Sequence, residues 1–150
     1  ESAGLRYRAL VVWDKGNAGL GPCFRPQHEL VLACCTGTAR YFNSSIGNVI
    51  KGKRVHSSKR EHPTEKPVDV LRQLLEVTTE PGDLVVDCFM GSGSSGVAAV
   101  GMGRRFAGCD WSPGYLETAH RRIVEVARGE VVAEQSTIAV QPSLFGEVSS

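Results

Sequence analysis

Short apolar runs predict two strands near the start of the chain. Residues 7–13 and 28–35 are rich in aliphatic and β-branched side chains, and residues 14–22 between them are rich in glycine and asparagine. Apolar runs bounded by turn residues are typical of strands. We therefore expect an antiparallel hairpin with a long loop over residues 7–35, placed at one edge of a sheet.

Helical spacing replaces these runs in the second half of the chain. Pro67 suits the first position of a helix, and after it apolar residues recur every three or four positions up to Thr78. The run Leu84–Val86 predicts a strand buried on both faces. Further elements expected are a helix of small residues at 97–102, a strand at 105–109, and a helix at 112–129 with the buried stripe Leu116, Ala119, Ile123 and Val126.

The connection between the two halves is polar and becomes basic. Residues 36–66 have little apolar periodicity, and such long connections in compact domains are often functional. Contact with a phosphate backbone is one interpretation, and a solvated surface loop is the other. The basic side chains that would contact DNA are Lys51, Lys53, Arg54, Lys59 and Arg60.

The order of these elements predicts an α/β fold with three layers and a mostly parallel sheet. Strands joined through a helix run parallel, and ligands bind at the carboxyl ends of such strands. We expect one domain over residues 1–130, made of the edge hairpin 7–35, the basic loop 36–62 and a βαβ unit at 63–128. Residues 131–150 are interpreted as a tail, within which 136–140 is either a short strand or a loop.

Composition excludes several classes of protein. The net charge is only +1, so any attraction to nucleic acid must be local. The five cysteines contain no C-x-x-C pair, which argues against a disulfide scaffold or a zinc site and favours free thiols in a reducing cytoplasm. No signal peptide and no run near the ~20 apolar residues of a membrane span is found, so no membrane partner is expected.

A glycine-rich segment carries the clearest chemical signal. Gly91, Gly93 and Gly96 follow the predicted strand at the spacing G-x-G-x-x-G, and Asp110 comes 19 residues after Gly91 at the end of the next strand. Glycines let a ligand approach the backbone, and an acid at that place suits ribose hydroxyls. The spacing fits an NAD site, but a second mononucleotide half would have room only if the order of the two halves were permuted. An NTPase loop requires Lys-Ser/Thr after its glycines, and this sequence lacks that pair.

The flanking segments add a resemblance to a known family. Residues 62–67, 83–96, 108–115 and 119–123, in that order, resemble the beta class of amino DNA methyltransferases, and the likeness covers residues 7–125. The resemblance implies a Rossmann-like fold that uses S-adenosylmethionine (AdoMet). It also implies methyl transfer to the exocyclic amine of a DNA base, more commonly adenine than cytosine, in a bacterial or phage restriction-modification setting.

The resemblance also implies roles for individual residues. Asp110 would bind the ribose hydroxyls, and Trp111 would lie against the adenine ring, although core packing is the alternative for this indole. Lys66 would help to close the pocket over the methionine end, although it could also be a plain surface charge. Thr64 and Pro67, from the same segment before the first helix, would close the pocket together with Lys66. The methionine and sulfonium group would be surrounded by Asp87, Phe89, Gly91, Ser92 and Gly93.

One part of the family pattern is missing. Its catalytic loop, Asp/Asn/Ser-Pro-Pro-aromatic, binds the target amine of a flipped base, and no such tetrapeptide occurs here. Residues 112–115, Ser-Pro-Gly-Tyr, come near it but match the second cofactor motif better. We expect this chain to be the C-terminal portion of a methyltransferase, or one half of a split enzyme, with residues 36–62 in the target-recognition position. On this interpretation the chain does not methylate double-stranded DNA alone.

The tail contains one further motif. Residues 141–145 are Gln-Pro-Ser-Leu-Phe and resemble the short peptide by which bacterial replication and repair proteins bind the sliding clamp. Gln141, Leu144 and Phe145 would anchor in an apolar pocket. The alternative is a tail without a partner.

Overall fold

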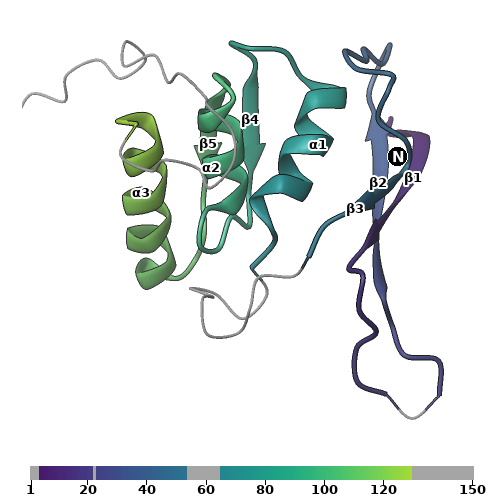
Figure 1. Ribbon diagram of the computed structural model, residues 1–150. Helices are drawn as coiled ribbons and strands as arrows, with labels where there is room; N and C mark the ends of the chain where they lie inside the picture. Colours follow the sequence, from purple (N-terminus) through teal and green to yellow (C-terminus); the bar gives the residue numbers. More distant parts are fainter. Residues whose placement is uncertain (1–3, 22, 54–64, 130–150) are drawn as a thin grey trace, which may run out of the picture.

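The computed structural model describes residues 4–21, 23–53 and 65–129. Its elements, shown in Figure 1, are β1 (Arg6–Asp14), β2 (His28–Cys35), β3 (Val49–Lys51), α1 (Val68–Thr78), β4 (Leu84–Asp87), α2 (Ser94–Gly101), β5 (Arg105–Gly108) and α3 (Pro113–Ala127). Every predicted strand and helix within the described residues is present, with ends that differ by at most a few residues.

The first sheet has the strand order β2-β1-β3. β1 and β2 pair antiparallel from Arg6 opposite Cys35 to Asp14 opposite His28, as predicted for a hairpin. β3 pairs parallel with β1, so β1 is the central strand. Residues 49–51 were predicted to belong to a connection without regular structure, and this prediction was wrong. Three residues are too few to show an alternating pattern inside a polar segment.

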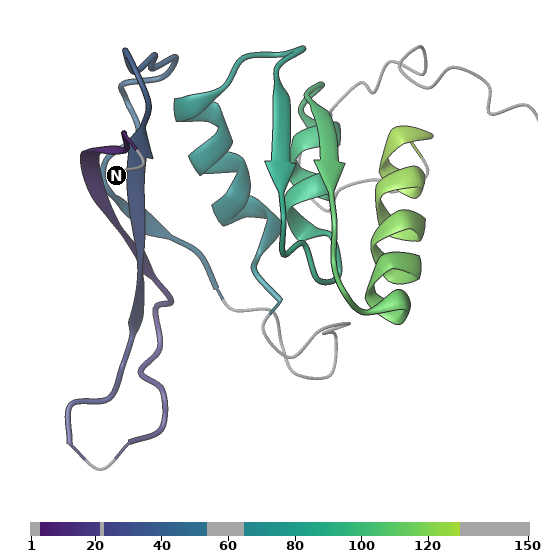
Figure 2. The same ribbon diagram turned by 180° about the vertical axis from the view of Figure 1, so that it is seen from behind.

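The second sheet is the parallel pair β4–β5, joined through α2 as predicted for a βαβ unit. Helix α2 contacts both of these strands and also lies between α1 and α3. Figures 1 and 2 show α1 standing between the two sheets. One row of helices therefore joins both sheets, which are separate within the described part of the chain.

The core beneath the first sheet is small and centred on Trp13. Trp13, Ile50 and Val70 are 4%, 3% and 3% exposed, and together they join β1, β3 and α1. The Trp13 indole N–H donates to the Gly52 carbonyl at 2.7 Å. A side chain at Gly52 would place its Cβ 2.3 Å from Val70 Cγ2, so glycine is required where the chain leaves β3.

The segment after β2 is folded against the carboxyl end of α1. The Phe42 amide donates to the Val77 carbonyl at 3.0 Å, and Asn43 Nδ2 donates to Glu76 Oε1 at 2.7 Å. Arg40 pairs with Glu80 at 3.1 Å. The first part of the expected recognition loop therefore lies at the end of α1 opposite to Lys66 and Pro67.

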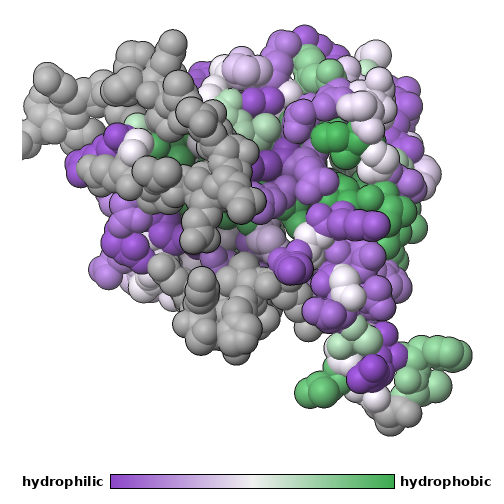
Figure 3. All heavy atoms as spheres, viewed as in Figure 1, coloured by the Kyte–Doolittle hydropathy of each residue, from purple (hydrophilic) through white to green (hydrophobic). Residues whose placement is uncertain are grey.

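The outer faces of both sheets are exposed among the described residues. Leu84 and Val86 on β4 are 51% and 62% exposed, so the prediction of a strand buried on both faces was wrong. Within residues 4–21, 23–53 and 65–129, helices cover one face of β4 and leave the other exposed. Figure 3 shows hydrophobic residues gathered over β1 and β2, where the exposed side chains include Leu10, Leu30 and Leu32.

No helix in the described ranges is long and apolar enough to serve as a membrane span.

Candidate functional site

The carboxyl ends of β4 and β5 bring two aspartates to one edge of the second sheet. Asp87 is the last residue of β4, and its carboxylate shapes the turn that follows. Asp87 Oδ1 accepts the Phe89 amide at 3.0 Å, and Oδ2 accepts the Ser95 hydroxyl at 2.5 Å. The acid therefore fixes the loop between β4 and α2.

Asp110 binds the same loop from the other strand. Its Oδ2 accepts the Gly91 amide at 2.9 Å, and its Oδ1 accepts the Ser112 amide at 3.0 Å. The carboxylate predicted to bind ribose thus lies where the glycine loop, the end of β5 and the start of α3 meet. Pairing of Asp87 with Gly108 sets the two strand ends side by side.

The glycines serve backbone geometry and helix packing. Gly91 and Gly93 have φ of 52° and 79°, a left-handed region that favours glycine. A Cβ at Gly93 would lie 2.7 Å from the Cβ of Ala119, and one at Gly96 would lie 2.4 Å from Ile123 Cδ1. The prediction from sequence explained these glycines by a tight turn and by the approach of a ligand, and the positive φ angles of Gly91 and Gly93 agree with the tight turn. At Gly93 and Gly96 the structure adds the close approach of α3.

Two aromatic side chains stand open beside the aspartates. Trp111 is 94% exposed and Phe89 is 89% exposed. The alternative that Trp111 packs in the core is therefore wrong. An exposed indole next to Asp110 offers a flat face to a ligand ring.

A buried hydroxyl lies at the amino end of α2. Ser94 is 6% exposed, and its Oγ finds no hydrogen-bond partner among the described residues. Buried polar atoms are normally satisfied, so this hydroxyl is an exception at the start of α2. Together, the exposed indole and the two strand-end acids suit the adenine and ribose parts of AdoMet.

The segment before α1 reaches the glycine loop through Arg122. Glu65 Oε1 pairs with Arg122 Nη2 at 2.8 Å, and these side chains are only 5% and 16% exposed. Arg122 Nη1 also donates to the Ser92 carbonyl at 2.7 Å and to the Ser92 hydroxyl at 2.9 Å. Neither Arg122 nor Glu65 was predicted from the sequence. Both residues lie within segments that carry the family resemblance, 62–67 and 119–123, but neither was assigned a role.

Lys66 points to the first sheet instead. Its Nζ binds Glu29 Oε2 at 2.7 Å, while Lys15 Nζ binds Glu29 Oε1 at 2.8 Å. Both ammonium groups lie over the Trp13 ring, at 5.7 and 5.4 Å from its centroid. Burial raises the pKa of Glu29, but hydrogen bonds from Lys15 and Lys66 lower it more, and the net pKa lies below its ordinary value. Lys66 is therefore more than an isolated surface charge.

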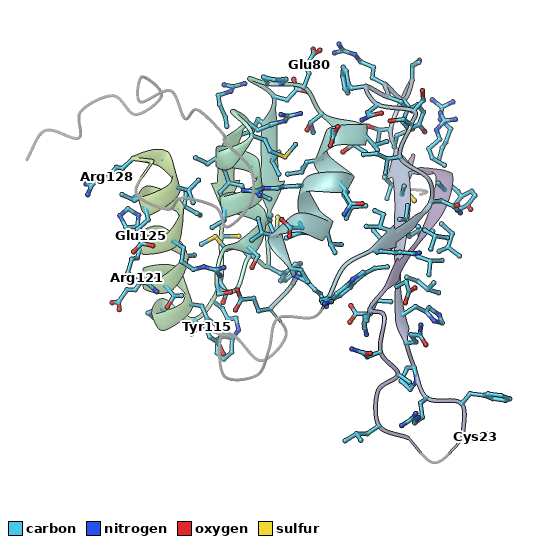
Figure 4. The ribbon with its side chains drawn as sticks, in the orientation of Figure 1. Cys23, Glu80, Tyr115, Arg121, Glu125 and Arg128 are labelled. Atoms are coloured by element: carbon cyan, nitrogen blue, oxygen red, sulfur yellow. The ribbon has the colours of Figure 1, made fainter. Side chains whose placement is uncertain are left out.

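The outward side of α3 differs from the side that carries Arg122. Figure 4 shows Arg121, Glu125 and Arg128 directed away from α2, with Tyr115 near the first turn of the helix. Arg121 pairs with Glu125 at 3.2 Å within the helix. Arg121 therefore lies on the outward side of α3, whereas its neighbour Arg122 is directed to the glycine loop and Glu65.

The remaining predicted residues fall into two groups. Lys51, opposite Asp14 at the carboxyl end of β3, and Lys53 are described and exposed. Within the described ranges, no cluster of His, Cys, Asp and Glu suits a metal ion. The residues that lie outside the described ranges are Arg54, Lys59, Arg60, Thr64, the ambiguous segment 136–140, and Gln141, Leu144 and Phe145.

A hollow lies beside the first sheet and the segment after β2. It is lined by Arg8, Cys35, Arg40, Tyr41 and Phe42, among others, and it reaches Asp83 just before β4. A hydrogen bond to Cys35 raises the pKa of Arg8 above its ordinary value. No described residue among those predicted to bind cofactor lines this hollow.

Comparison with known proteins gives consistent results. Residues 1–121 match a family model for N6 and N4 methyltransferases, described as DNA methylase. The putative methylase YubD of Escherichia coli (strain K12) is 36% identical over 128 residues, which are 85% of this chain and 56% of YubD. The type II methyltransferase M1.MboII of Moraxella bovis is 41% identical over 71 residues, which are 47% of this chain and 26% of that enzyme.

Solved structures agree with the fold. A complex of M1.HpyAVI with SAM has a TM-score of 0.69 at 27% identity, over 80% of this chain and 63% of that one. The cytosine-N4-specific PvuII DNA methyltransferase has a TM-score of 0.64 at 18% identity, over 85% of this chain and 52% of that one. The predicted Rossmann-like α/β methyltransferase fold is thus confirmed, and the chain belongs to the N6/N4 family of DNA methylases.

Proposed function

We propose that this chain is the AdoMet-binding part of a DNA methyltransferase that modifies the exocyclic amine of adenine. One observation carries the proposal most directly. The carboxylate of Asp110, at the end of one parallel strand, holds the Gly91 amide of the loop that follows the neighbouring strand, at 2.9 Å. This bond places the acid and the glycine loop together at the carboxyl ends of two parallel strands, where α/β folds bind nucleotide-like ligands.

The described side chains suggest a division of the cofactor site. Asp110 is assigned to the ribose hydroxyls and Trp111 to the adenine face. The methionine and sulfonium end is assigned to the loop after β4, with Asp87, Phe89, Gly91, Ser92 and Gly93, and its closure is assigned to the segment with Thr64, Lys66 and Pro67. In the structure the Lys66 ammonium pairs with Glu29, so this assignment requires the Lys66 side chain to turn toward the glycine loop. When bound, AdoMet supplies an electrophilic methyl group, and the protein positions it toward the target amine.

The catalytic Pro-Pro loop is not found in these 150 residues. We assign it to another polypeptide segment, either elsewhere in the same protein or in a second chain. On this proposal the chain binds AdoMet but does not transfer its methyl group alone. Cytosine is the second candidate for the target base, and Lys51, Lys53, Arg54, Lys59 and Arg60 are candidates for contact with DNA phosphates.

Two further assignments rest on sequence alone. The motif with Gln141, Leu144 and Phe145 is assigned to the sliding clamp, and the chain to the bacterial or phage cytoplasm. Loss of clamp pull-down by Leu144→Ala together with Phe145→Ala would support the first. No binding by the intact chain would exclude it.

Two measurements test the proposed function. The glycine spacing also fits an NAD-dependent oxidoreductase, and calorimetry with AdoMet and with NAD separates the two functions. We expect the chain to bind AdoMet and not NAD. Labelled AdoMet is then incubated with the chain and unmethylated DNA, and the DNA is digested to nucleosides. We expect no labelled nucleoside. Labelled adenine or cytosine would show that the chain is catalytically complete, and residues 112–115 would become the first suspects for the catalytic loop.

A further inference from the structure

Arg122 joins two segments that are far apart in the sequence. On one side its guanidinium pairs with Glu65, the neighbour of Lys66 and Pro67. On the other side it donates to both the carbonyl and the hydroxyl of Ser92, between the two glycines with positive φ. Both segments are the ones assigned to the methionine end of AdoMet.

The burial of the Arg122–Glu65 pair indicates that it orients neighbouring groups more than it stabilises the fold. Glu65 is 5% exposed and Arg122 is 16% exposed, so both charges are largely removed from water. Burying an ion pair returns little net stability, while the planar guanidinium fixes several acceptors at defined positions. The absence of side chains at Gly93 and Gly96 already lets α3 approach α2 and the loop closely. Arg122 adds a defined direction for the Ser92 carbonyl and a link to residue 65.

We propose that Arg122, together with Glu65, is a positioning residue that aligns the glycine loop and the segment 65–67 around the methionine moiety of AdoMet. This inference rests on the proposed function. Arg122 acts through Ser92 and Glu65, whereas the adenosine half of the cofactor is assigned to Asp110 and Trp111, which follow β5. Loss of Arg122 should therefore weaken binding of the methionine half selectively.

Calorimetry with two ligands tests this selectivity. The ligands are AdoMet and 5′-methylthioadenosine, which keeps the adenosine half and lacks the amino-acid end. Arg122→Gln should lower AdoMet affinity about 10- to 100-fold, the loss expected for hydrogen bonds to a charged group. Affinity for 5′-methylthioadenosine should change less than about threefold. Equal losses for both ligands would indicate a general structural defect and would overturn the proposal.

Matched variants separate the effect of the Arg122 charge from that of its planar shape and from the loss of any arginine on α3. Arg121→Gln removes the neighbouring arginine, which pairs with Glu125 along the exposed side of α3, and it should leave both affinities unchanged. Arg122→Lys keeps the charge but loses the planar fork, so its AdoMet affinity should lie between those of wild type and Arg122→Gln. Glu65→Gln and the double variant should show non-additive losses, because both side chains act through one contact.

Hydrogen exchange of the chain without ligand tests the link itself. Arg122→Gln should speed exchange of amides in residues 88–95, whereas Arg121→Gln should not. Unchanged exchange in Arg122→Gln would overturn the inference. A wild-type chain that binds no AdoMet, but whose Arg122→Gln variant exchanges faster, would overturn the proposed function while supporting the link between the two segments.

Discussion

Trp111 shows at the scale of a single residue how exposure separates a binding role from a structural one. Its side chain is 94% exposed and contributes little to the core. Trp111→Ala should therefore change the free energy of unfolding by no more than about 0.5 kcal/mol. Loss of a stacking face should cost about 1–3 kcal/mol of AdoMet binding. Thermal denaturation and calorimetry on the same samples check both values; a large fall in stability with unchanged affinity would contradict the assignment.

Glu29 predicts a pH dependence of stability. Its pKa is lower in the folded state than its ordinary value of 4.5, so its stabilising contribution is present above that value and is lost as the pH falls through the folded pKa. Glu29→Gln leaves Lys15, only 7% exposed, without its partner. The variant should be less stable than wild type at pH 7, and the difference should shrink below about pH 4.5.

Urea midpoints between about pH 3 and pH 7 measure this difference. Glu117→Gln serves as the control because Glu117 is an exposed acid on α3. A difference between wild type and Glu29→Gln that stays constant across the pH range would contradict the role of the two lysines.

Sequence reasoning found the residues whose signal is local. Asp87, Gly91 and Asp110 were predicted because they follow strands at a defined spacing, and the structure brings them to one edge. Glu29 and Arg122 were missed because their partners lie 37 and 30 residues away in the chain. Contacts between charged residues so far apart in the sequence are set by the fold, and no local pattern predicts them.

At the scale of elements, α2 can pack closely against α3 because Gly96 has no side chain. A Cβ at Gly96 would approach Ile123 Cδ1 to 2.4 Å and Phe106 Cε1 to 2.8 Å. Gly96→Ala should therefore destabilise the chain by about 1–3 kcal/mol through overpacking, despite the better helix propensity of alanine. Gly114→Ala on α3 is the matched control, since a Cβ at that position would meet nothing within 4 Å. Equal midpoints for both variants in urea would contradict this account.

The elements themselves were predictable where their pattern was long enough. The hairpin, the βαβ unit and the helices α1, α2 and α3 follow from periodicity and turn residues. β3 was missed because only Ile50 of its three residues is buried, opposite Trp13 of β1. Such a short strand is defined by its neighbour, and no periodicity within residues 36–66 could reveal it.

At the scale of the whole molecule, the helices cover one side and the outer sheet faces stay exposed among the described residues. Val86→Thr on the outer face of β4 should therefore change stability by less than about 0.5 kcal/mol. Val70→Thr, with the same change of shape and polarity, should cost about 1–3 kcal/mol because Val70 is 3% exposed. Chemical denaturation compares the two. A large loss from Val86→Thr would mean that this face is covered in the isolated chain.

The contrast between the two tryptophans of the sequence makes the chain its own optical probe. Trp13 is 4% exposed and Trp111 is 94% exposed, so the first should emit at shorter wavelength and resist iodide quenching, whereas the second should emit near the wavelength of free indole and be quenched. Unfolding would be followed through Trp13 and ligand binding through Trp111. In Trp111→Ala, the remaining emission would report the junction of β1, β3 and α1, where Trp13 lies.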